Sequence, residues 1–358
     1  MEAEVSYHDF DLEFKEPAGT SRGVYRTRHV WYVRIQTPDG RFGLGECAPL
    51  PDLSCDAEAD PKVYEEHLRK ALQELGQWYR LQEQRSQAEN KEALTLLFES
   101  LRNYPSILMG VETALYHHAR NSWAIWGNTP FAEGKAGIPI NGLIWMGTFE
   151  EMYKRIHEKM EAGFRCIKLK IGAIDFEKEL ALLQFIRLHF SASDLELRVD
   201  ANGAFPVELA PERLQRLAEF ELHSIEQPIR QGQWEAMARL CETTPLPIAL
   251  DEELIGINDP TEKARLLDAI HPQYLILKPS LHGSFWGTSE WIRLAEKRGL
   301  GWWITSALES NVGLNAIAQY CALLKVSVPQ GLGTGQLFTN NIPSPLRIKG
   351  DELWFDGK

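Results

Sequence analysis

The segment R-C-I-K-L-K-I-G, residues 165–172, alternates apolar and charged side chains as a β-strand does. Ile167, Leu169 and Ile171 would share one face of this strand, and Lys168 and Lys170 would share the other. Taken alone, the two lysines fit either a solvated edge strand or two ammonium groups directed into a site. The segments around this strand decide between the two interpretations.

The same strand signal recurs from residue 137 onward at intervals of about 25–30 residues, the length of one βα unit. Repeated βα units imply parallel strands, and seven or eight of them favour a closed barrel over a doubly wound sheet. The prediction is therefore an α/β fold, a TIM-like (β/α)7β barrel. We expect strands at 138–144, 166–170, 195–200, 222–227, 246–251, 274–278 and 301–305, with a weaker eighth strand near 328–334.

The first part of the chain has a different pattern. Residues 30–37, V-W-Y-V-R-I-Q-T, are strongly β-prone, whereas residues 62–127 carry helical spacing. This pattern predicts a separate α+β domain over residues 1–130 and a barrel domain over 131–339. The remaining residues, 340–358, are expected to form strand and turn and to pack back on the N-terminal domain.

Bulk properties narrow the class of protein. The 358 residues are 44% apolar and 25% charged with a net charge of −12, which argues against a dedicated nucleic-acid binder. The sequence contains no apolar run of about 18 residues, so no membrane helix is expected. The N-terminal M-E-A-E-V-S does not resemble a signal peptide. Five scattered cysteines predict free thiols in a reducing cytoplasm rather than a zinc site. These properties do not indicate an oligomeric state.

Five successive predicted strands end on an ionisable residue, although parallel strands covered on both faces are normally apolar. These residues are Lys170, Asp200, Glu226, Asp251 and Lys278, at spacings of 30, 26, 25 and 27 residues. A single such residue is more often a helix cap or a solvated charge. Five in the same phase, each opposite the bulky apolar residues of its strand, instead predict charges that converge at the C-terminal mouth of the barrel.

Charge balance indicates the chemistry of this mouth. Asp200, Glu226 and Asp251 need a cation if they share a partly dry cavity, and their oxygen atoms favour Mg²⁺ first and Mn²⁺ second. Lys170 and Lys278 flank them, and a lysine beside a metal and another lysine is expected to have a lowered pKa and to act as a base. A metal and a lysine together suit the removal of a proton α to a carboxylate, so the expected partner is a small-molecule carboxylate.

Motifs along the barrel resemble the enolase superfamily and its muconate-lactonising subgroup. They are K-L-K at 168–170, V-D-A-N at 199–202, E-Q-P at 226–228, D-E at 251–252 and L-K-P-S at 277–280. Within this subgroup, residues 43–54, 305–314 and 330–334 are similar to the o-succinylbenzoate synthase family. The resemblance implies that the N-terminal domain caps the barrel. It also implies a magnesium-dependent lyase that dehydrates a cyclohexadiene carboxylate, SHCHC, in a syn reaction to o-succinylbenzoate in menaquinone biosynthesis.

The resemblance also implies roles for individual lysines. Lys170 would remove the α-proton and then protonate the departing hydroxide. Lys278 would stabilise the enediolate from the opposite face, by a cation–π contact. Lys168 would lie beside Lys170 and help to set its pKa.

Polar residues near these lysines and carboxylates are expected to support them. Asn202 and Gln227 would orient the metal ligands, and Glu252 or Glu253 would be a further carboxylate near the metal. Ser306 and Ser310 are predicted to bind the tail of the substrate, although loop capping is equally expected for either hydroxyl alone.

The same scaffold and lysines also fit other activities. Residues 331–338, G-L-G-T-G-Q-L-F, lack the acidic pair with which dipeptide epimerases of the subgroup hold a substrate ammonium. Two lysines also suit an N-acylamino acid racemase or a muconate-type cycloisomerase. A barrel that binds metal and ligand without catalysis would not need two bases, and a Schiff-base aldolase would not need three carboxylates.

Overall fold

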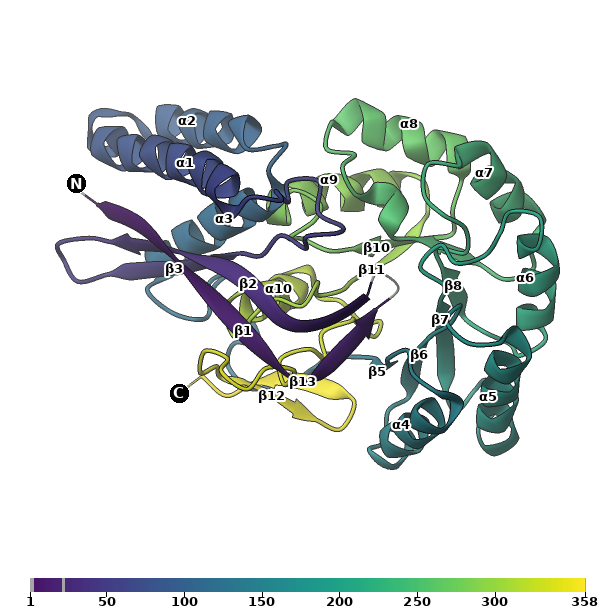
Figure 1. Cartoon of the computed structure of the whole chain (residues 1–358). Coiled ribbons are helices and arrows are strands. Elements are labelled where there is room, and N and C mark those ends of the chain that lie inside the picture. Colours follow the sequence, from purple (N-terminus) through teal and green to yellow (C-terminus); the bar gives the residue numbers. More distant parts are fainter. Residues whose placement is uncertain (1–2, 21–22, 358) are drawn as a thin grey trace.

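The computed structural model describes residues 3–20 and 23–357, which form an N-terminal sheet with helices, a parallel barrel and a C-terminal hairpin (Figure 1). The N-terminal sheet is antiparallel with strand order β1-β2-β3. Its strands are β1 (Glu4–Thr20), β2 (Gly23–Gln36) and β3 (Phe42–Cys47), and its helices are α1 (Pro61–Leu81), α2 (Gln87–Ser100) and α3 (Pro105–Arg120). The strand predicted at 30–37 thus lies within β2 and ends one residue earlier.

Helix α3 packs unusually close to strand β3, because glycines remove the side chains at the contact. A Cβ atom added to Gly45 would lie 1.8 Å from the carbonyl oxygen of Gly110. A Cβ atom added to Gly110 would lie 2.3 Å from the Sγ atom of Cys47. The helix therefore lies directly on the strand, and the apolar face of the sheet is buried beneath α1 and α3.

Seven parallel strands, each followed by a helix, form the wall of the barrel, in agreement with the predicted fold class. The strands are β5 (Gly142–Ile144), β6 (Cys166–Lys170), β7 (Glu196–Asp200), β8 (Ser224–Glu226), β9 (Ile248–Leu250), β10 (Tyr274–Leu277) and β11 (Gly301–Ile304). The helices are α4 (Phe149–Glu161), α5 (Phe176–His189), α6 (Ala210–Ala218), α7 (Trp234–Thr243), α8 (Pro260–Ile270), α9 (Ser284–Lys297) and α10 (Asn311–Leu324).

The eighth strand position is reduced to two residues that close the barrel. Gln330 forms a parallel bridge with Ile140, and Gly331 forms one with Thr305. The strand predicted near 328–334 is therefore much shorter than expected. Pro329 has no N–H to donate and the following glycines weaken strand structure, so a longer ladder does not form.

Strand ends differ slightly from the predicted ones. Strands β9 and β10 end at Leu250 and Leu277, so that Asp251 and Lys278 follow their strands directly. The segment 138–144 splits into β4 (Ile138–Pro139) and β5. These shifts of one or a few residues leave each charge at the C-terminal end of its strand.

The C-terminal segment contacts both parts of the molecule. Strands β12 (Leu346–Lys349) and β13 (Glu352–Phe355) form a sheet with β4, next to the barrel. Before them, the side-chain amide of Asn340 donates to the carbonyl oxygen of Asp11 in β1 at 2.8 Å. Residue 340 therefore bonds to β1, whereas the hairpin pairs with β4. The packing of residues 340–358 on the N-terminal domain stays a prediction. The domain boundary itself stays a prediction.

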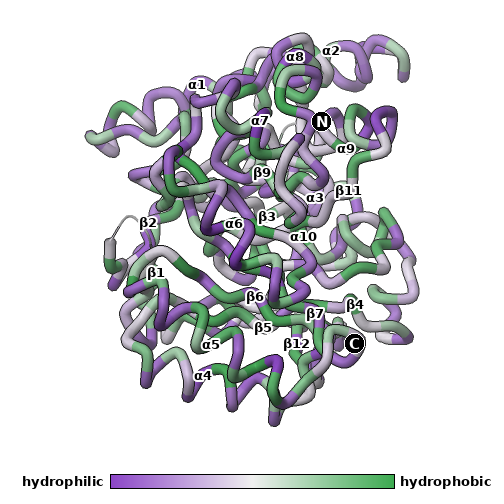
Figure 2. The backbone as a smooth tube through the Cα atoms, turned by 90° about the vertical axis from the view of Figure 1, so that its right-hand side faces the viewer, coloured by the Kyte–Doolittle hydropathy of each residue, from purple (hydrophilic) through white to green (hydrophobic). Residues whose placement is uncertain are grey.

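The two faces of the barrel strands carry different residues. Outward-facing residues such as Leu169, Val199 and Leu275 pack under the helices in one large apolar cluster. Hydrophilic and hydrophobic residues recur along the outer helix α4, which buries Met152 and Ile156 as an amphipathic helix does (Figure 2). Inside the barrel, the guanidinium of Arg198 lies 4.1 Å from the ring centre of Trp303. Among the described residues, no helix is long and apolar enough to span a bilayer.

The contact between α3 and β3 can be tested by substitution. Gly45→Ala should lower the free energy of unfolding by about 3 kcal/mol, because the new Cβ atom would collide with backbone rather than with a flexible side chain. Gly76→Ala in α1 is the matched control, since its Cβ atom would meet only Arg80 at 3.9 Å and should stabilise the helix by about 1 kcal/mol. Denaturant unfolding measures both. Equal stability of Gly45→Ala and the unmodified protein would contradict the packing described.

Candidate active site

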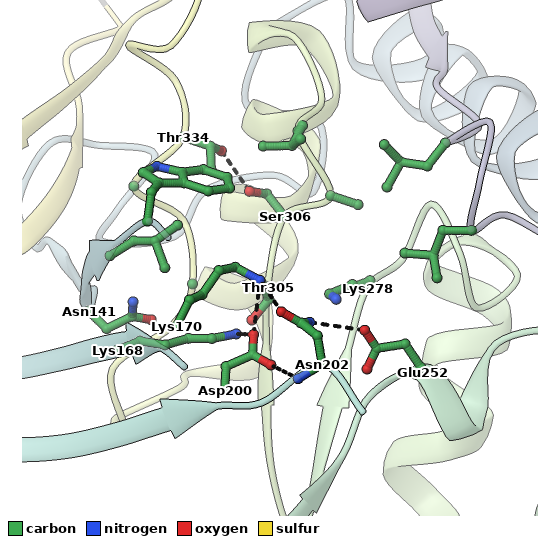
Figure 3. Close-up of a pocket in the computed structure, with 18 of the residues that line it drawn as sticks. Asn141, Lys168, Lys170, Asp200, Asn202, Glu252, Lys278, Thr305, Ser306 and Thr334 are labelled. Atoms are coloured by element: carbon green, nitrogen blue, oxygen red, sulfur yellow. Dashed lines mark hydrogen bonds and ion pairs between the residues drawn. The ribbon is translucent and has the colours of Figure 1, made fainter. Parts of the chain in front are cut away.

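A pocket opens at the C-terminal ends of the barrel strands, where active sites of such barrels lie. Its floor consists of charged and polar residues from the strand ends, and its outer wall includes Leu50 and Leu53 from the loop after β3. Figure 3 shows the polar side chains converging from several strands on one region. The labelled residues are Asn141, Lys168, Lys170, Asp200, Asn202, Glu252, Lys278, Thr305, Ser306 and Thr334.

Lys168 is the most buried of the three lysines. Its Nζ atom donates to both carboxylate oxygens of Glu226, at 2.8 and 2.7 Å, and lies 2.9 Å from Oδ2 of Asp200. Burial lowers the pKa of Lys168, but the carboxylates of Asp200 and Glu226 raise it more, so the net shift is upward. The interior position predicted for this lysine is thus explained by two acids from neighbouring strands, β7 and β8.

Lys170 ends the same strand and points into the pocket. Its Nζ atom donates to Oδ1 of Asn202 at 2.7 Å and to Oδ2 of Asp200 at 3.2 Å. Asn202 also donates from its side chain to Glu252 at 3.0 Å and from its backbone to Oδ1 of Asp200 at 3.0 Å. Its backbone has φ +45°, a conformation that asparagine tolerates better than most residues. Asn202 therefore fixes the ammonium group of Lys170 relative to both acids.

Lys278 approaches the pocket from strand β10, on the other side of Asn202 from Lys170 (Figure 3). Its Nζ atom bonds to Oδ2 of Asp251. Burial lowers the pKa of Lys278, but Asp251 and Glu226 raise it more, so the net shift is upward. The expected lowering of a lysine pKa rested on a neighbouring cation. In the structure the nearest charges are carboxylates, which stabilise the ammonium form.

The carboxylates around these lysines are crowded. The ammonium groups of Lys168 and Lys170 outweigh burial and lower the pKa of Asp200. Burial, reinforced by the charge of Asp200, raises the pKa of Glu226 well above its usual value. Burial, reinforced by the charge of Asp251, raises the pKa of Glu252 to about 7. Burial and the neighbouring acids therefore favour the protonated forms of Glu226 and Glu252, whereas the lysines favour the charged form of Asp200.

The chemistry of this cluster of carboxylates fits a bound cation. Within residues 3–20 and 23–357, no three Asp, Glu, His or Cys side chains surround a common position suited to a metal. Asp200, Glu226 and Asp251 come together as predicted, but their oxygens are turned to lysine ammonium groups. Oδ1 of Asp251 is buried and accepts no hydrogen bond from the described residues. The atoms of these three acids that could bind a metal are all oxygens, the ligands that Mg²⁺ and Mn²⁺ prefer.

Gln227 lies beside these acids and bonds to the ends of two strands. Its side-chain oxygen accepts the backbone N–H groups of Asp251 and Glu253, at 3.2 and 3.3 Å. Its side-chain nitrogen donates to the carbonyl oxygen of Ile229 at 3.0 Å and to Glu253 at 3.1 Å. Gln227 thus ties the end of strand β9 to the end of β8. Glu253 belongs to this support, whereas Glu252 lines the pocket.

The two serines predicted to bind substrate lie in different environments. Ser306 lines the pocket, with its Oγ atom 2.6 Å from the hydroxyl of Thr334. Ser310 does not line it. Its buried hydroxyl accepts the N–H of Val312 as the N-cap of α10 and donates to Glu46 at 2.5 Å. Ser310 therefore has the helix-capping role that was the alternative to substrate contact, and a contact between Ser310 and substrate stays a prediction.

Several pocket residues were not found from the sequence. Leu50, Leu53, Trp145 and Leu308 form an apolar wall opposite the charged floor. Apolar residues in loops carry no periodic signal, so only the position of the 43–54 motif pointed to this region. Asn141 and Thr334 lie on the segments that close the barrel. The site therefore combines a charged floor, predicted from strand ends, with an apolar wall that depends on tertiary packing.

Comparison with known proteins agrees with this architecture. The family described as "Enolase C-terminal domain-like" matches residues 151–353. An o-succinylbenzoate synthase of Desulfotalea psychrophila is 47% identical, over 98% of this chain and 98% of that protein. The crystal structure of MenC from the same organism has a TM-score of 0.83 at 44% identity and covers 99% of this chain and 100% of that chain.

A more distant structure supports the fold. The L-Ala-D/L-Glu epimerase from Bacillus subtilis has a TM-score of 0.81 at 21% identity and covers 99% of this chain and 96% of that chain. The family match and the near relative, together with the lysines and carboxylates on successive strand ends, lead to one assignment. The chain belongs to the enolase superfamily and, within it, to the o-succinylbenzoate synthase family.

Proposed function

We propose that the protein is a lyase that dehydrates SHCHC to o-succinylbenzoate in menaquinone biosynthesis. The observation that carries this proposal is the placement of Lys170 and Lys278 on two sides of one pocket, above buried carboxylates. The near relative of the same family and length supports the choice of reaction. The unpaired cysteines of the described chain fit the proposed setting, a reducing cytoplasm.

Lys170 is the proposed acid–base group. As a free amine, its Nζ atom takes the proton from the ring carbon that bears the carboxylate. As an ammonium, it then gives that proton to the hydroxide that leaves from the same face, so that water departs and the ring becomes aromatic. Asn202 and Asp200 hold Nζ at the mouth, which keeps the lysine in position for both transfers.

Lys278 and Lys168 supply positive charge around the reacting carboxylate. Lys278 is proposed to stabilise the negative charge that develops as the α-proton leaves. Lys168, bonded to Asp200 and Glu226, is proposed to hold these acids in place and to add to the field on Lys170. Lys168 is buried and Lys278 is largely shielded from solvent, so their charges act in a region of lowered dielectric constant.

Asp200, Glu226 and Asp251 are the residues proposed to hold Mg²⁺, with Mn²⁺ as a substitute. When bound, the ion supplies Lewis-acid stabilisation to the substrate carboxylate. Gln227 supports this set through the backbone of Asp251, and Asn202 supports it through Asp200. Burial, reinforced by the charge of Asp200, raises the pKa of Glu226, and a cation bound beside this carboxylate would favour its charged form.

The metal requirement is directly testable. SHCHC should be converted to o-succinylbenzoate in the presence of Mg²⁺, with a change in ultraviolet absorbance. EDTA should abolish the conversion, and added Mg²⁺ or Mn²⁺ should restore it. Asp251→Asn should need much more metal for the same rate, because one ligand charge is lost. Full turnover in EDTA would contradict the metal assignment, and no turnover at saturating Mg²⁺ would contradict the reaction.

The lysine roles predict different losses. Lys170→Ala should lower kcat roughly 10³-fold, within the range for loss of a general acid–base group. Lys278→Ala should lower kcat roughly 10²-fold, as expected when one electrostatic stabiliser is removed. Lys178→Ala, at an exposed position of α5, is the control and should leave kcat unchanged. Steady-state kinetics measure all three, and a Lys170→Ala protein with normal kcat would show that the base is another group.

The two-sided arrangement of Lys170 and Lys278 also supports a second activity, racemisation of N-acylamino acids. With one base on each face, each lysine would exchange the α-proton of one enantiomer. In D₂O, the unmodified protein should incorporate deuterium into both enantiomers. Lys170→Ala should lose exchange with one enantiomer and Lys278→Ala with the other, as measured by NMR. Absence of exchange from both enantiomers in the unmodified protein would exclude this activity.

A further inference from the structure

Two loops form the outer wall of the pocket, and neither is part of a helix or strand. One is residues 48–54, after β3 of the N-terminal domain, and the other is residues 305–310, after β11 of the barrel. We name them the mouth loops. The first contributes Leu50 and Leu53 to the pocket, and the second contributes Ala307 and Leu308. These four residues pack against one another across the domain boundary.

Arg28 of strand β2 joins the two mouth loops beneath this wall. It is 3% exposed, and its guanidinium donates to three main-chain carbonyl oxygens. Nη1 donates to Pro49 at 2.5 Å and Nη2 donates to Ala48, both in the first mouth loop. Nε donates to Leu308 at 3.4 Å, in the second. One planar group therefore fixes the separation of the two loops, as the fork geometry of arginine allows.

Two buried acids surround this arginine and extend its contacts. Glu309 accepts the N–H of Ala307 at 2.7 Å and the hydroxyl of Ser280 at 2.5 Å, two residues after Lys278. Glu46 of β3 accepts the N–H groups of Ser310 and Gly313, at 2.7 and 2.8 Å, at the start of α10. The attraction of both acids offsets part of the cost of burying Arg28. Together these residues connect the N-terminal domain to the loops after β10 and β11.

The second mouth loop also contains a strained residue. Leu308 has φ +64°, in the left-handed region that residues other than glycine, asparagine and aspartate rarely adopt. Such a conformation persists only when the surrounding contacts determine it. Here Arg28 holds the carbonyl oxygen of Leu308, and Glu309 holds the N–H of Ala307. These bonds therefore place the Leu308 side chain in the pocket wall.

We propose that Arg28 is a positioning residue that sets the width of the apolar wall and thereby the affinity for the substrate. This inference rests on the proposed function, because the substrate in question is the ring and aliphatic tail of SHCHC. Arg28 does not line the pocket. Its effect is on where Leu50, Leu53 and Leu308 lie, while the charged floor stays on the strand ends. Loss of Arg28 should therefore weaken binding more than it slows the chemical step.

Arg28→Met and Arg102→Met form a matched pair of variants. Arg102 also connects the N-terminal domain to the barrel, with bonds to Glu290 at 3.0 Å and to the carbonyl oxygen of Asn258 at 2.7 Å, but away from the pocket. Both variants should have a lower Tm. Only Arg28→Met should raise the KM for SHCHC, by about tenfold, with kcat changed by less than about threefold. Arg28→Lys should give an intermediate KM, because an ammonium group lacks the planar fork of the guanidinium. This variant replaces Arg28→Met in the test if Arg28→Met does not fold.

A measurement that does not depend on turnover separates this inference from the proposed function. Amide hydrogen exchange of both mouth loops should accelerate at least about tenfold in Arg28→Met, or to a smaller degree in Arg28→Lys, and should not change in Arg102→Met. An unchanged KM, or an equal rise of KM in Arg102→Met, would overturn the inference while the dehydration itself stands. If the unmodified protein does not turn over SHCHC, the proposed function fails, and the exchange rates alone decide whether Arg28 positions the loops.

Discussion

The mutual compensation of buried lysines and carboxylates at the barrel mouth is the constraint on which the rest of the structure depends. Lys168 can be buried only because Asp200 and Glu226 lie within 3 Å of its ammonium group. These acids lie there only because β6, β7 and β8 are neighbouring parallel strands that end at the same level. Removing one partner would leave an uncompensated buried charge. The charged residues can therefore be buried only while the neighbouring strands hold them together.

The same constraint places the charged residues and the apolar wall of the pocket on different kinds of element. The lysines and acids are on strands, which packing on both faces makes rigid. The residues that would contact the less polar part of a substrate are on loops from two domains, which can differ without disturbing the strands. The likeness to the L-Ala-D/L-Glu epimerase, at 21% identity over nearly the whole chain, accordingly concerns the fold and not the substrate.

The sequence was sufficient for the charged floor because alternation along a strand fixes the face of each residue. Once Lys168 and Lys170 were placed opposite Ile167 and Leu169, their convergence with Asp200 followed from the geometry of parallel strands. The role of Ser310 does not follow in the same way, because a serine just before a helix is equally compatible with helix capping and with ligand binding. The pocket wall at Leu50 and Leu308 depends on contacts between distant loops, which no local pattern encodes.

The charged cluster at the strand ends and the cluster around Arg28 therefore have different physical consequences. At the strand ends, burial and the charge of a neighbouring acid raise the pKa of Glu226, so this cluster would favour an added cation such as the proposed metal. Around Arg28, each charged group is bonded to backbone atoms of the loops that it joins, so the cluster fixes main-chain positions. Hydrogen bonds from a charged group to backbone have defined directions, which apolar packing alone does not provide. A wall of leucines on two irregular loops could slide without them, and a polar cluster beneath the wall is what makes its position specific.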